Sequence, residues 1–435
     1  MKRKITKALE YWKTNESHMP YMLIGARQVG KTYIIEEFCK NNYKDFIYIN
    51  LEWEKEITSI FEETIVPNKI INRIEIIKDM NINEEESIIF FDEIQVSEKA
   101  ITSLKYFNEN EKKYNIICAG SLLGVALNRF KSSYPVGKVR RAYMFPMDFE
   151  EFMWAIGQER LASEVRNCFI SDKEMFESGH EKLIEIYKEY LYVGGMPASI
   201  LHHISNERDL TKHKKETKQD ILSDYIADMS KYTTTHENIK IKKIYESIPK
   251  QLGREKNKFT YKLIDEGAKK ARYETAIDWL INSKLVHKCT MIESPRVPLK
   301  VYEKDNYFKI YLSDVGLLME LSRMTLYDLF NDEANIFRGM ITENFVAQTL
   351  TCSGIDLNYW KSGHTGEIDF LINIKGNVIP VEVKSATNTK SKSLKTYKEK
   401  YNPKYSIKIS NKNFGYANNI KSVPLYAVHL IGELL

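Results

Sequence analysis

Short apolar runs alternate with amphipathic stretches in the first third of the chain. The runs have the length of buried parallel strands and cover residues 21–24, 46–51, 88–91 and 114–121. Stretches between them, such as residues 33–38, have apolar side chains at helical spacing. This alternation predicts an α/β fold in which helices flank a parallel sheet.

The strand and helix alternation stops near residue 150, and a mainly helical region follows. Residues 149–192 and 209–232 have the pattern of charged amphipathic helices. Residues 239–288 read as helix, turn and helix, with a strand near 285–291. This order is compatible with a winged helix.

The last region returns to a mixed pattern after Phe337. We expect one helix over 342–350, followed by strands at 357–360, 368–374 and 378–383. The final part of the chain is therefore predicted to be a second α/β domain.

Composition narrows the classes of protein to consider. Hydrophobic residues make up 43% and charged residues 28% of the chain, which excludes a disordered or fibrous protein. The length of 435 residues suggests about three domains. No apolar run approaches the ~20 residues that span a bilayer, and the N-terminus lacks the apolar segment of a signal peptide. We therefore expect a cytoplasmic protein with no membrane partner.

Cysteine and histidine patterns argue against a metal-stabilised or disulfide-linked fold. The five cysteines are scattered and form no CxxC pair, as expected in a reducing compartment. The nine histidines, including His202 and His203, show no metal-ligand spacing. We interpret them as structural or surface residues.

A glycine-rich segment after the first apolar run has the full Walker A pattern. Gly25 and Gly30 enclose four residues, and Lys31 and Thr32 follow. Glycines let backbone N–H groups point at a β-phosphate, Lys31 would neutralise phosphate charge, and the Thr32 hydroxyl would ligate magnesium. The expected ligands are ATP and Mg²⁺. The expected nucleotide-binding residues are Gly25, Ala26, Arg27, Gln28, Val29, Gly30, Lys31 and Thr32.

Two adjacent carboxylates, Asp92 and Glu93, end the third apolar run where a Walker B motif belongs. Asp92 would hold the magnesium ion through water, and Glu93 would act as the general base that polarises the attacking water. Ser121 follows the next strand and has two interpretations. It is either a sensor beside the γ-phosphate or the N-cap of a helix.

These segments resemble a prokaryotic family of AAA-type ATPases that carry a C-terminal domain of unknown function. The resemblance implies an ATP-binding fold, a helical or winged-helix middle and a nuclease-like C-terminus. It rests on residues 23–32, 91–95 and 119–121, and on the further segments 135–139, 145–152, 192–197 and 308–317. Residues 3 to 410 take part in the match.

Many members of that family have arginine where this chain has Lys138. An arginine there would be a candidate trans-acting finger, whereas Lys138 lacks the bidentate fork. Arg140 or Arg141 could take the role, or all three could be ordinary surface residues. AAA-type ATPases commonly share sites between subunits, so the resemblance also implies a homo-oligomer.

The C-terminal constellation resembles the PD-(D/E)xK core of restriction-endonuclease-like nucleases. Glu382 and Lys384 point the same way because side chains alternate along a strand. Asp369 and Glu382 would bind a divalent metal, and Glu343 would support it from a helix. Lys384 would position the hydroxide or stabilise developing charge. Either the site is an active nuclease, or it is a degenerate scaffold that binds nucleic acid or protein.

Charge distribution adds a candidate nucleic-acid partner. Net charge is only +5, but residues 384–421 contain ten lysines against Glu399 alone. Lys269, Lys270 and Arg272 could contact phosphates from a DNA-reading helix. In both places an ordinary solvated face is the alternative.

We therefore expect three domains and an ATPase that controls nucleic-acid binding or cleavage, with DNA as the partner. The expected domains are an AAA-type P-loop domain at 1–155, a helical and winged-helix region at 156–325 and a nuclease-like domain at 326–435. The rival hypothesis is a nucleotide-controlled switch that binds a protein partner through an inactive C-terminal domain. The presence of Asp369, Glu382 and Lys384 counts against that rival.

Overall fold

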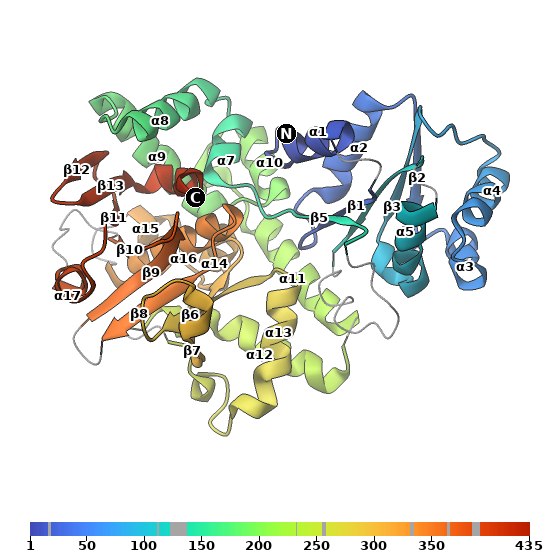
Figure 1. Cartoon of the computed structure of the whole chain (residues 1–435). Coiled ribbons are helices and arrows are strands. Elements are labelled where there is room, and N and C mark those ends of the chain that lie inside the picture. The colour runs from blue at the N-terminus through green and yellow to red at the C-terminus, as the bar shows by residue number, and fades with distance from the viewer. Residues whose placement is uncertain are drawn as a thin grey trace. The chain divides into compact units, whose positions relative to one another are not determined.

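The computed structural model describes two compact units (Figure 1). The N-terminal unit contains residues 2–145 with 282–284, and the C-terminal unit contains residues 146–281 and 285–435 with Met1. The described residues are 1–15, 19–110, 113–121, 137–231, 233–254, 258–330, 335–362, 366–384 and 392–435. Pro135 and Val136 of the expected family segment, and Lys390 of the lysine run, lie outside these residues.

A parallel five-stranded sheet forms the centre of the N-terminal unit, in the order β2-β3-β4-β1-β5. Its strands are β1 (Tyr21–Ile24), β2 (Asp45–Asn50), β3 (Ser87–Asp92), β4 (Asn115–Gly120) and β5 (Arg140–Tyr143). The parallel sheet with flanking helices that the apolar runs predicted is confirmed. β5 was not predicted, because its sequence carries two exposed arginines instead of an apolar run.

Helices cover both faces of this sheet. The helices are α1 (Ile5–Asn15), α2 (Lys31–Asn42), α3 (Lys55–Glu63), α4 (Pro67–Lys78) and α5 (Glu98–Asn110). Apolar side chains of α3, α4 and α5 pack with Ile49 and Phe91 in one core cluster. On α1, Trp12 packs against Tyr21 of β1 and Phe38 of α2, with ring centroids 5.4 and 6.5 Å away.

The C-terminal unit begins with helices, as expected. These are α7 (Phe149–Ala155), α8 (Glu159–Ser171), α9 (Glu177–Val193), α10 (Pro197–Ser205), α11 (Lys215–Lys231), α12 (Thr235–Leu252) and α13 (Lys270–Asn282). Four more helices follow: α14 (Val315–Leu321), α15 (Leu326–Phe330), α16 (Asn335–Cys352) and α17 (Lys392–Tyr401). The winged helix stays a prediction, although α12 and α13 are followed by an antiparallel pair of strands.

An eight-stranded mixed sheet completes this unit, in the order β12-β13-β11-β10-β9-β8-β6-β7. Its strands are β6 (Val286–Ile292), β7 (Glu303–Leu312), β8 (Asn358–Ser362), β9 (Gly366–Ile374), β10 (Asn377–Val383), β11 (Ser406–Ser410), β12 (Gly415–Ala417) and β13 (Ile420–Pro424). β6 pairs in parallel with β8, so that Met291 lies opposite Tyr359.

The three expected domains differ from the two compact units and stay a prediction. The expected boundary at residue 325 lies within one compact unit, because β6 and β7 share a sheet with the later strands. The expected boundary at 155 coincides with the last residue of α7, whereas the main segment of the N-terminal unit ends at Phe145. The pairing of β6 with β8 was not visible in the local pattern, because it joins residues that are far apart in sequence.

The carboxylate of Asp314 ties together two segments that the sequence singled out. It accepts hydrogen bonds from the backbone N–H of Gly195 at 2.6 Å and of Leu317 at 2.9 Å. Asp314 is 1% exposed, and burial raises its pKa, whereas the bond from Gly195 opposes the rise. The turn after α9 is therefore fixed to the start of α14.

Candidate functional site

The glycine-rich loop lies between β1 and α2, as a nucleotide-binding loop requires. Gly30 has φ +93°, a left-handed conformation that favours glycine. A Cβ at Gly25 would lie 2.2 Å from the carbonyl oxygen of Met144, so only glycine fits there. The loop therefore runs close to its neighbouring backbone and leads into the N-terminus of α2, where helix N–H groups favour an anion.

Lys31 lies across this loop and is 6% exposed. Its Nζ donates to the carbonyl oxygens of Gly25 at 3.0 Å and Ala26 at 2.8 Å. These contacts keep the ammonium group inside the loop, where a bound phosphate would lie. The remaining predicted loop residues Arg27, Gln28 and Val29 follow, and Gln28 has φ +63°.

Thr32 and Asp92 meet where α2 begins and β3 ends. The Thr32 hydroxyl donates to Oδ2 of Asp92 at 2.9 Å. Burial raises the pKa of Asp92, while the bond from Thr32 lowers it. A hydroxyl and a carboxylate are ligands that suit hydrated Mg²⁺, so these two residues fit the expected ion.

Tyr48 on β2 was not singled out from the sequence, yet it contacts the same carboxylate. Its hydroxyl donates to Oδ2 of Asp92 at 3.2 Å, and burial raises the pKa of Tyr48 to about 12. The Tyr48 phenol therefore stays protonated and is a donor to Asp92.

Glu93 follows Asp92 in a left-handed conformation, with φ +51°. Its Oε2 accepts hydrogen bonds from the Gln95 side chain and, at 3.4 Å, from the Ser121 hydroxyl. Ser121 is thus next to the expected general base. The alternative interpretation, in which Ser121 is the N-cap of a helix, depends on residues 122–136, which lie outside the described residues.

Arg3 supports the loop from the start of the chain, although sequence reasoning missed it. Its guanidinium donates to the carbonyl oxygens of Val29 at 2.8 Å and Phe145 at 2.7 Å. Arg3 is only 7% exposed. A charged residue among the first few is not by itself a signal, so only the fold reveals this contact.

The three candidates for a trans-acting finger, which would reach the nucleotide of a neighbouring subunit, differ in their surroundings. Lys138 forms an ion pair with Glu109 at 3.2 Å in the same unit. Arg140 and Arg141 are exposed on β5 at the edge of the sheet. The trans-acting role stays a prediction for all three residues.

The predicted C-terminal residues come from α16 and two neighbouring strands of the large sheet. Asp369 on β9 accepts a 2.7 Å hydrogen bond from the backbone N–H of Val383 on β10. Glu382 on β10 forms an ion pair at 2.7 Å with Lys384, which directly follows the strand. Burial raises the pKa of Asp369, and Glu382 and Glu343 raise it further. The Asp369 carboxylate is therefore held at the end of β10, beside the residue that separates Glu382 from Lys384.

Two lysines and one glutamate that the sequence did not single out complete this cluster. Lys309 on β7 is 1% exposed and contacts Glu343 at 2.9 Å and Glu367 at 2.7 Å. Lys361 on β8 contacts the other oxygen of Glu367, also at 2.7 Å. A lone lysine inside the apolar run 308–312 is the signal that could have revealed Lys309.

The donor set of this C-terminal cluster does not form a metal cage. Among the described residues, no three His, Cys, Asp or Glu side chains come together in an arrangement that could hold a metal ion. Instead, Glu343 and Glu382 each have a lysine ammonium within ion-pair distance. The expected ligands Glu343, Asp369 and Glu382 therefore lie near one another without an assembled metal site.

The two basic regions differ in their exposed faces. On α13, the exposed residues include the basic Arg272 and the acidic Glu274 and Asp278. Lys270 forms an ion pair with Glu274 at 3.4 Å. On α17, the exposed side includes Lys392, Lys395 and Lys400. Leu394 and Tyr397 face the other way, into the core.

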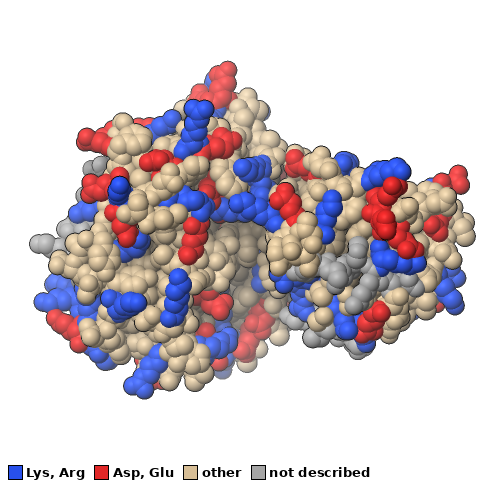
Figure 2. All heavy atoms as spheres, turned by 45° about the horizontal axis from the view of Figure 1, so that its top comes forward, with Lys and Arg blue, Asp and Glu red and all other residues tan. Residues whose placement is uncertain are grey.

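Surface charge as a whole forms no single patch on the face seen in Figure 2. Basic and acidic side chains are interspersed there. The net charge of +5 therefore carries little information about a partner. Local arrangements such as α17 are more informative.

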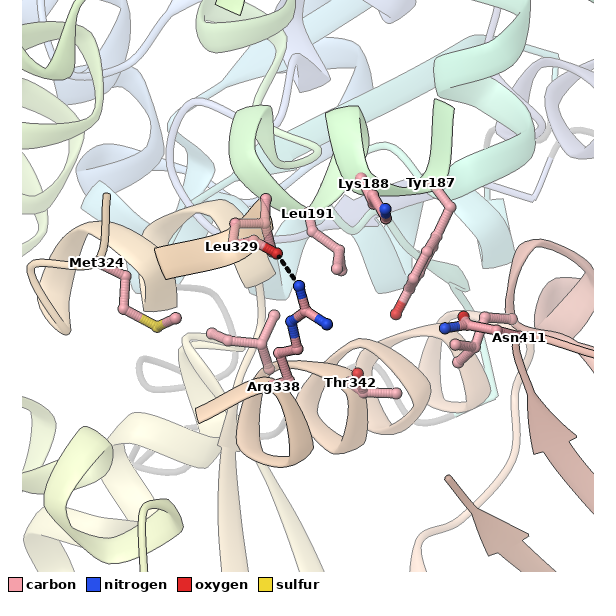
Figure 3. A pocket seen from close by; sticks show the side chains of 10 residues that line it. Tyr187, Lys188, Leu191, Met324, Leu329, Arg338, Thr342 and Asn411 are labelled. Atoms are coloured by element: carbon pink, nitrogen blue, oxygen red, sulfur yellow. Dashed lines mark hydrogen bonds between the residues drawn. The ribbon is translucent and has the colours of Figure 1, made fainter. Parts of the chain in front are cut away.

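A small cavity of about 40 Å³ lies in the C-terminal unit, separate from the predicted site residues (Figure 3). Arg338 reaches toward it from α16 and donates to the carbonyl oxygen of Leu329 at 3.0 Å. Tyr187 and Lys188 of α9 face it from the opposite side. Its volume suits only a few water molecules.

Three families match successive parts of the chain. Residues 17–153 match the family described as AAA domain. Residues 184–328 match a domain of unknown function (DUF8612), and residues 338–428 match another (DUF4143). The first match contains the glycine-rich loop and the two carboxylates, so the chain carries an AAA-type P-loop ATPase domain.

Individual relatives are distant. An uncharacterized protein of Methanocaldococcus jannaschii is 26% identical over 206 residues, which span 47% of this chain and 39% of that protein. The Walker-type ATPase of Pyrococcus abyssi has a TM-score of 0.45 at 16% identity, covering 74% of this chain and 95% of that one. The ORC2 protein of Aeropyrum pernix has a TM-score of 0.39 at 13% identity, covering 78% and 93%.

Within the part of the chain that the structure describes, none of the helices is both long and apolar enough to cross a bilayer.

Proposed function

We propose that this chain binds and hydrolyses ATP in its N-terminal unit and uses the nucleotide cycle to control nucleic-acid engagement by its C-terminal unit. The observation that carries the ATPase part is the contact between Thr32 and Asp92 beside the glycine-rich loop. It brings the two expected magnesium ligands together at the end of the loop. The AAA domain match over residues 17–153 supports the same activity.

Residues of the loop and of the two neighbouring strand ends would each have one role in this reaction. Lys31 would exchange its two carbonyl partners for oxygens of the β- and γ-phosphates. Thr32 and Asp92 would hold Mg²⁺, which neutralises phosphate charge when it is bound. Glu93 would accept the proton of the attacking water, and Ser121 would orient the Glu93 carboxylate.

The test of the ATPase proposal separates binding from hydrolysis. Lys31→Ala should abolish ATP binding, because the loop loses the ammonium group that is predicted to neutralise the β- and γ-phosphates. Glu93→Gln should bind ATP normally but hydrolyse it at least about a hundredfold more slowly. Normal turnover by Glu93→Gln would overturn the general-base assignment.

Nucleic-acid binding rests on the lysines of α17. Lys392, Lys395 and Lys400 are exposed within one ten-residue helix, with Glu399 as its only acidic residue. Phosphate contacts from such a face would not depend on base sequence. The exposed carboxylates of α13 make that helix the weaker candidate for a DNA-reading element.

A second candidate function is a nucleotide-controlled switch that binds a protein partner. The observation in its favour is that Glu343 and Glu382 are each paired with a lysine. Among the residues that the structure describes, no group of three His, Cys, Asp or Glu side chains could hold a metal ion. In this case the C-terminal unit would be a binding platform without catalysis.

Cleavage assays distinguish the two candidates. Plasmid, linear and single-stranded DNA would be incubated with Mg²⁺ or Mn²⁺, with and without ATP, using the wild type and Glu382→Ala. Cleavage that is lost in the variant would establish a metal-dependent nuclease. No cleavage, or equal cleavage by both proteins, would favour the switch.

A further inference from the structure

One ammonium group joins three elements of the C-terminal unit. Lys309 lies on β7, and its Nζ contacts Oε1 of Glu343 on α16 at 2.9 Å. The same Nζ contacts Oε1 of Glu367 on β9 at 2.7 Å. The side chain of Lys309 is 1% exposed, whereas those of Glu343 and Glu367 are 15% and 26% exposed, so the cation is buried and its two partners are partly buried.

Electrostatics explains why a cation is needed at this position. Glu343 and Glu367 both contact the Lys309 ammonium, and two like charges this close repel each other unless a cation lies between them. The charge of Asp369 also acts on Lys309. The Tyr311 hydroxyl also donates to Glu343, at 2.5 Å, but it is neutral. Lys309 therefore supplies the positive charge that a bound divalent ion would otherwise bring.

Lys309 cannot easily move away from the cluster. Strand β7 is fixed to α16 by Asn344, whose side chain accepts from the Leu312 N–H at 2.8 Å and donates to the Leu312 carbonyl at 3.1 Å. Asn344 is fully buried. Lys384, in contrast, is 32% exposed and can swing off Glu382 toward solvent.

We propose that Lys309 is a built-in counter-ion of this carboxylate cluster and competes with divalent cations for it. Glu343 is held by Lys309 and is therefore withheld from metal ligation. The cluster then binds a divalent cation weakly, through Asp369 and Glu382, after Lys384 has moved. This inference rests on the proposed C-terminal site only for the identity of the metal-binding carboxylates.

Mn²⁺ binding by the full-length, nucleotide-free chain tests this inference, with free Mn²⁺ measured by electron paramagnetic resonance. Lys309→Met keeps the length of the side chain without its charge, and Lys309→Arg keeps the charge. We expect Lys309→Met to bind Mn²⁺ at least about tenfold more tightly than the wild type, because a competing cation is gone. Lys309→Arg should bind like the wild type. Unchanged or weaker binding by a folded Lys309→Met protein would overturn the inference.

A second pair of variants covers the case in which Lys309→Met does not fold. Lys309→Gln lacks the positive charge but keeps a polar group that can hydrogen-bond with Glu343, and it should also bind Mn²⁺ at least about tenfold more tightly than the wild type. Glu382→Gln should abolish the binding. Unchanged or weaker binding by Lys309→Gln, or no binding in any variant, would overturn the inference. A failure to cleave or bind DNA would count only against the proposed function, because Mn²⁺ binding is measured without nucleic acid.

Discussion

The hydroxyl of Thr32 and the carboxylate of Asp92 form a 2.9 Å hydrogen bond that connects the first turn of α2 to the last residue of β3. The two residues are 60 positions apart in the sequence. Their contact brings a hydroxyl and a buried carboxylate to one point beside the glycine-rich loop. The ATPase proposal can therefore be tested at a single pair of oxygen atoms.

Replacement of Thr32 tests the role of that hydroxyl. Thr32→Val keeps the shape of the side chain but removes the oxygen, so Mg²⁺-dependent ATP hydrolysis should fall about a hundredfold. Thr32→Ser keeps the oxygen and should stay within about threefold of the wild type. A steady-state phosphate-release assay across Mg²⁺ concentrations measures both effects. Equal rates in Thr32→Val and the wild type would contradict the ligand assignment.

Arg3 offers a test of loop support from outside the motif. Arg3→Met should leave the Val29 and Phe145 carbonyls without their charged donor, and it should raise the Kd for ATP about tenfold. Lys2→Met removes a neighbouring charge from an exposed position and serves as the control. Fluorescent nucleotide titration would give both dissociation constants. An unchanged Kd in Arg3→Met would show that the loop holds its shape without Arg3.

A buried histidine predicts how stability depends on pH. The Ser199 hydroxyl donates to the Val193 carbonyl at 2.7 Å, so Nε2 of His213, 3.3 Å away, is the donor to Ser199. Among the described residues Nδ1 of His213 has no hydrogen-bond partner. Burial, together with Lys218, lowers the pKa of His213 to about 3 from an ordinary 6.5. The other groups that face it are His202, His203 and the ring of Tyr192.

Below pH 6.5 the unfolded chain takes up a proton at His213 that the folded chain does not. Stability should therefore fall as the pH falls from about 6.5 toward 3. His213→Phe keeps a ring but cannot titrate. Between pH 7 and pH 5 the Tm of the wild type should drop by about 3 °C more than that of the variant. Parallel Tm values across this range would show that His213 contributes nothing to the pH dependence.

Salt dependence tests the basic face of α17. The triple variant Lys392→Gln, Lys395→Gln, Lys400→Gln should bind duplex DNA more weakly. The slope of log K against log salt should also become shallower by about two to three. A matched control changes Lys7, Lys40 and Lys69, which are exposed lysines of the N-terminal unit, to glutamine. If both triple variants lost affinity equally, α17 would have no specific role.

The nucleotide site could be predicted because its signals are local. Gly25, Lys31 and Thr32 lie within eight residues, and Asp92 ends an apolar run that has the pattern of a buried strand. The supporting contacts were not predictable in this way. Arg3 reaches Phe145 across 142 positions, and no local pattern records such a contact.

In the C-terminal cluster, too, the local relationship could be predicted and the long-range contact could not. The alternation of side chains along a strand predicted that Glu382 and Lys384 point the same way, and the two form an ion pair although β10 ends at Val383. Lys309 lies 34 positions before its partner Glu343. In the sequence-based division, Lys309 falls in the middle region, 156–325, and Glu343 in the C-terminal domain. Its meeting with Glu343 depends on β6 and β7 joining the later strands. That pairing was decided by the fold as a whole and not by any segment of it.

The parallel pairing of β6 with β8 has an evolutionary consequence. The segments matched by the two families of unknown function meet in this one sheet, where Ile292 and Trp360 lie opposite each other. Recombination between residues 328 and 338 would separate β8 from its neighbour and expose the inner edge of the sheet. A new combination of the two segments would therefore need a β6 strand that can still pair with β8.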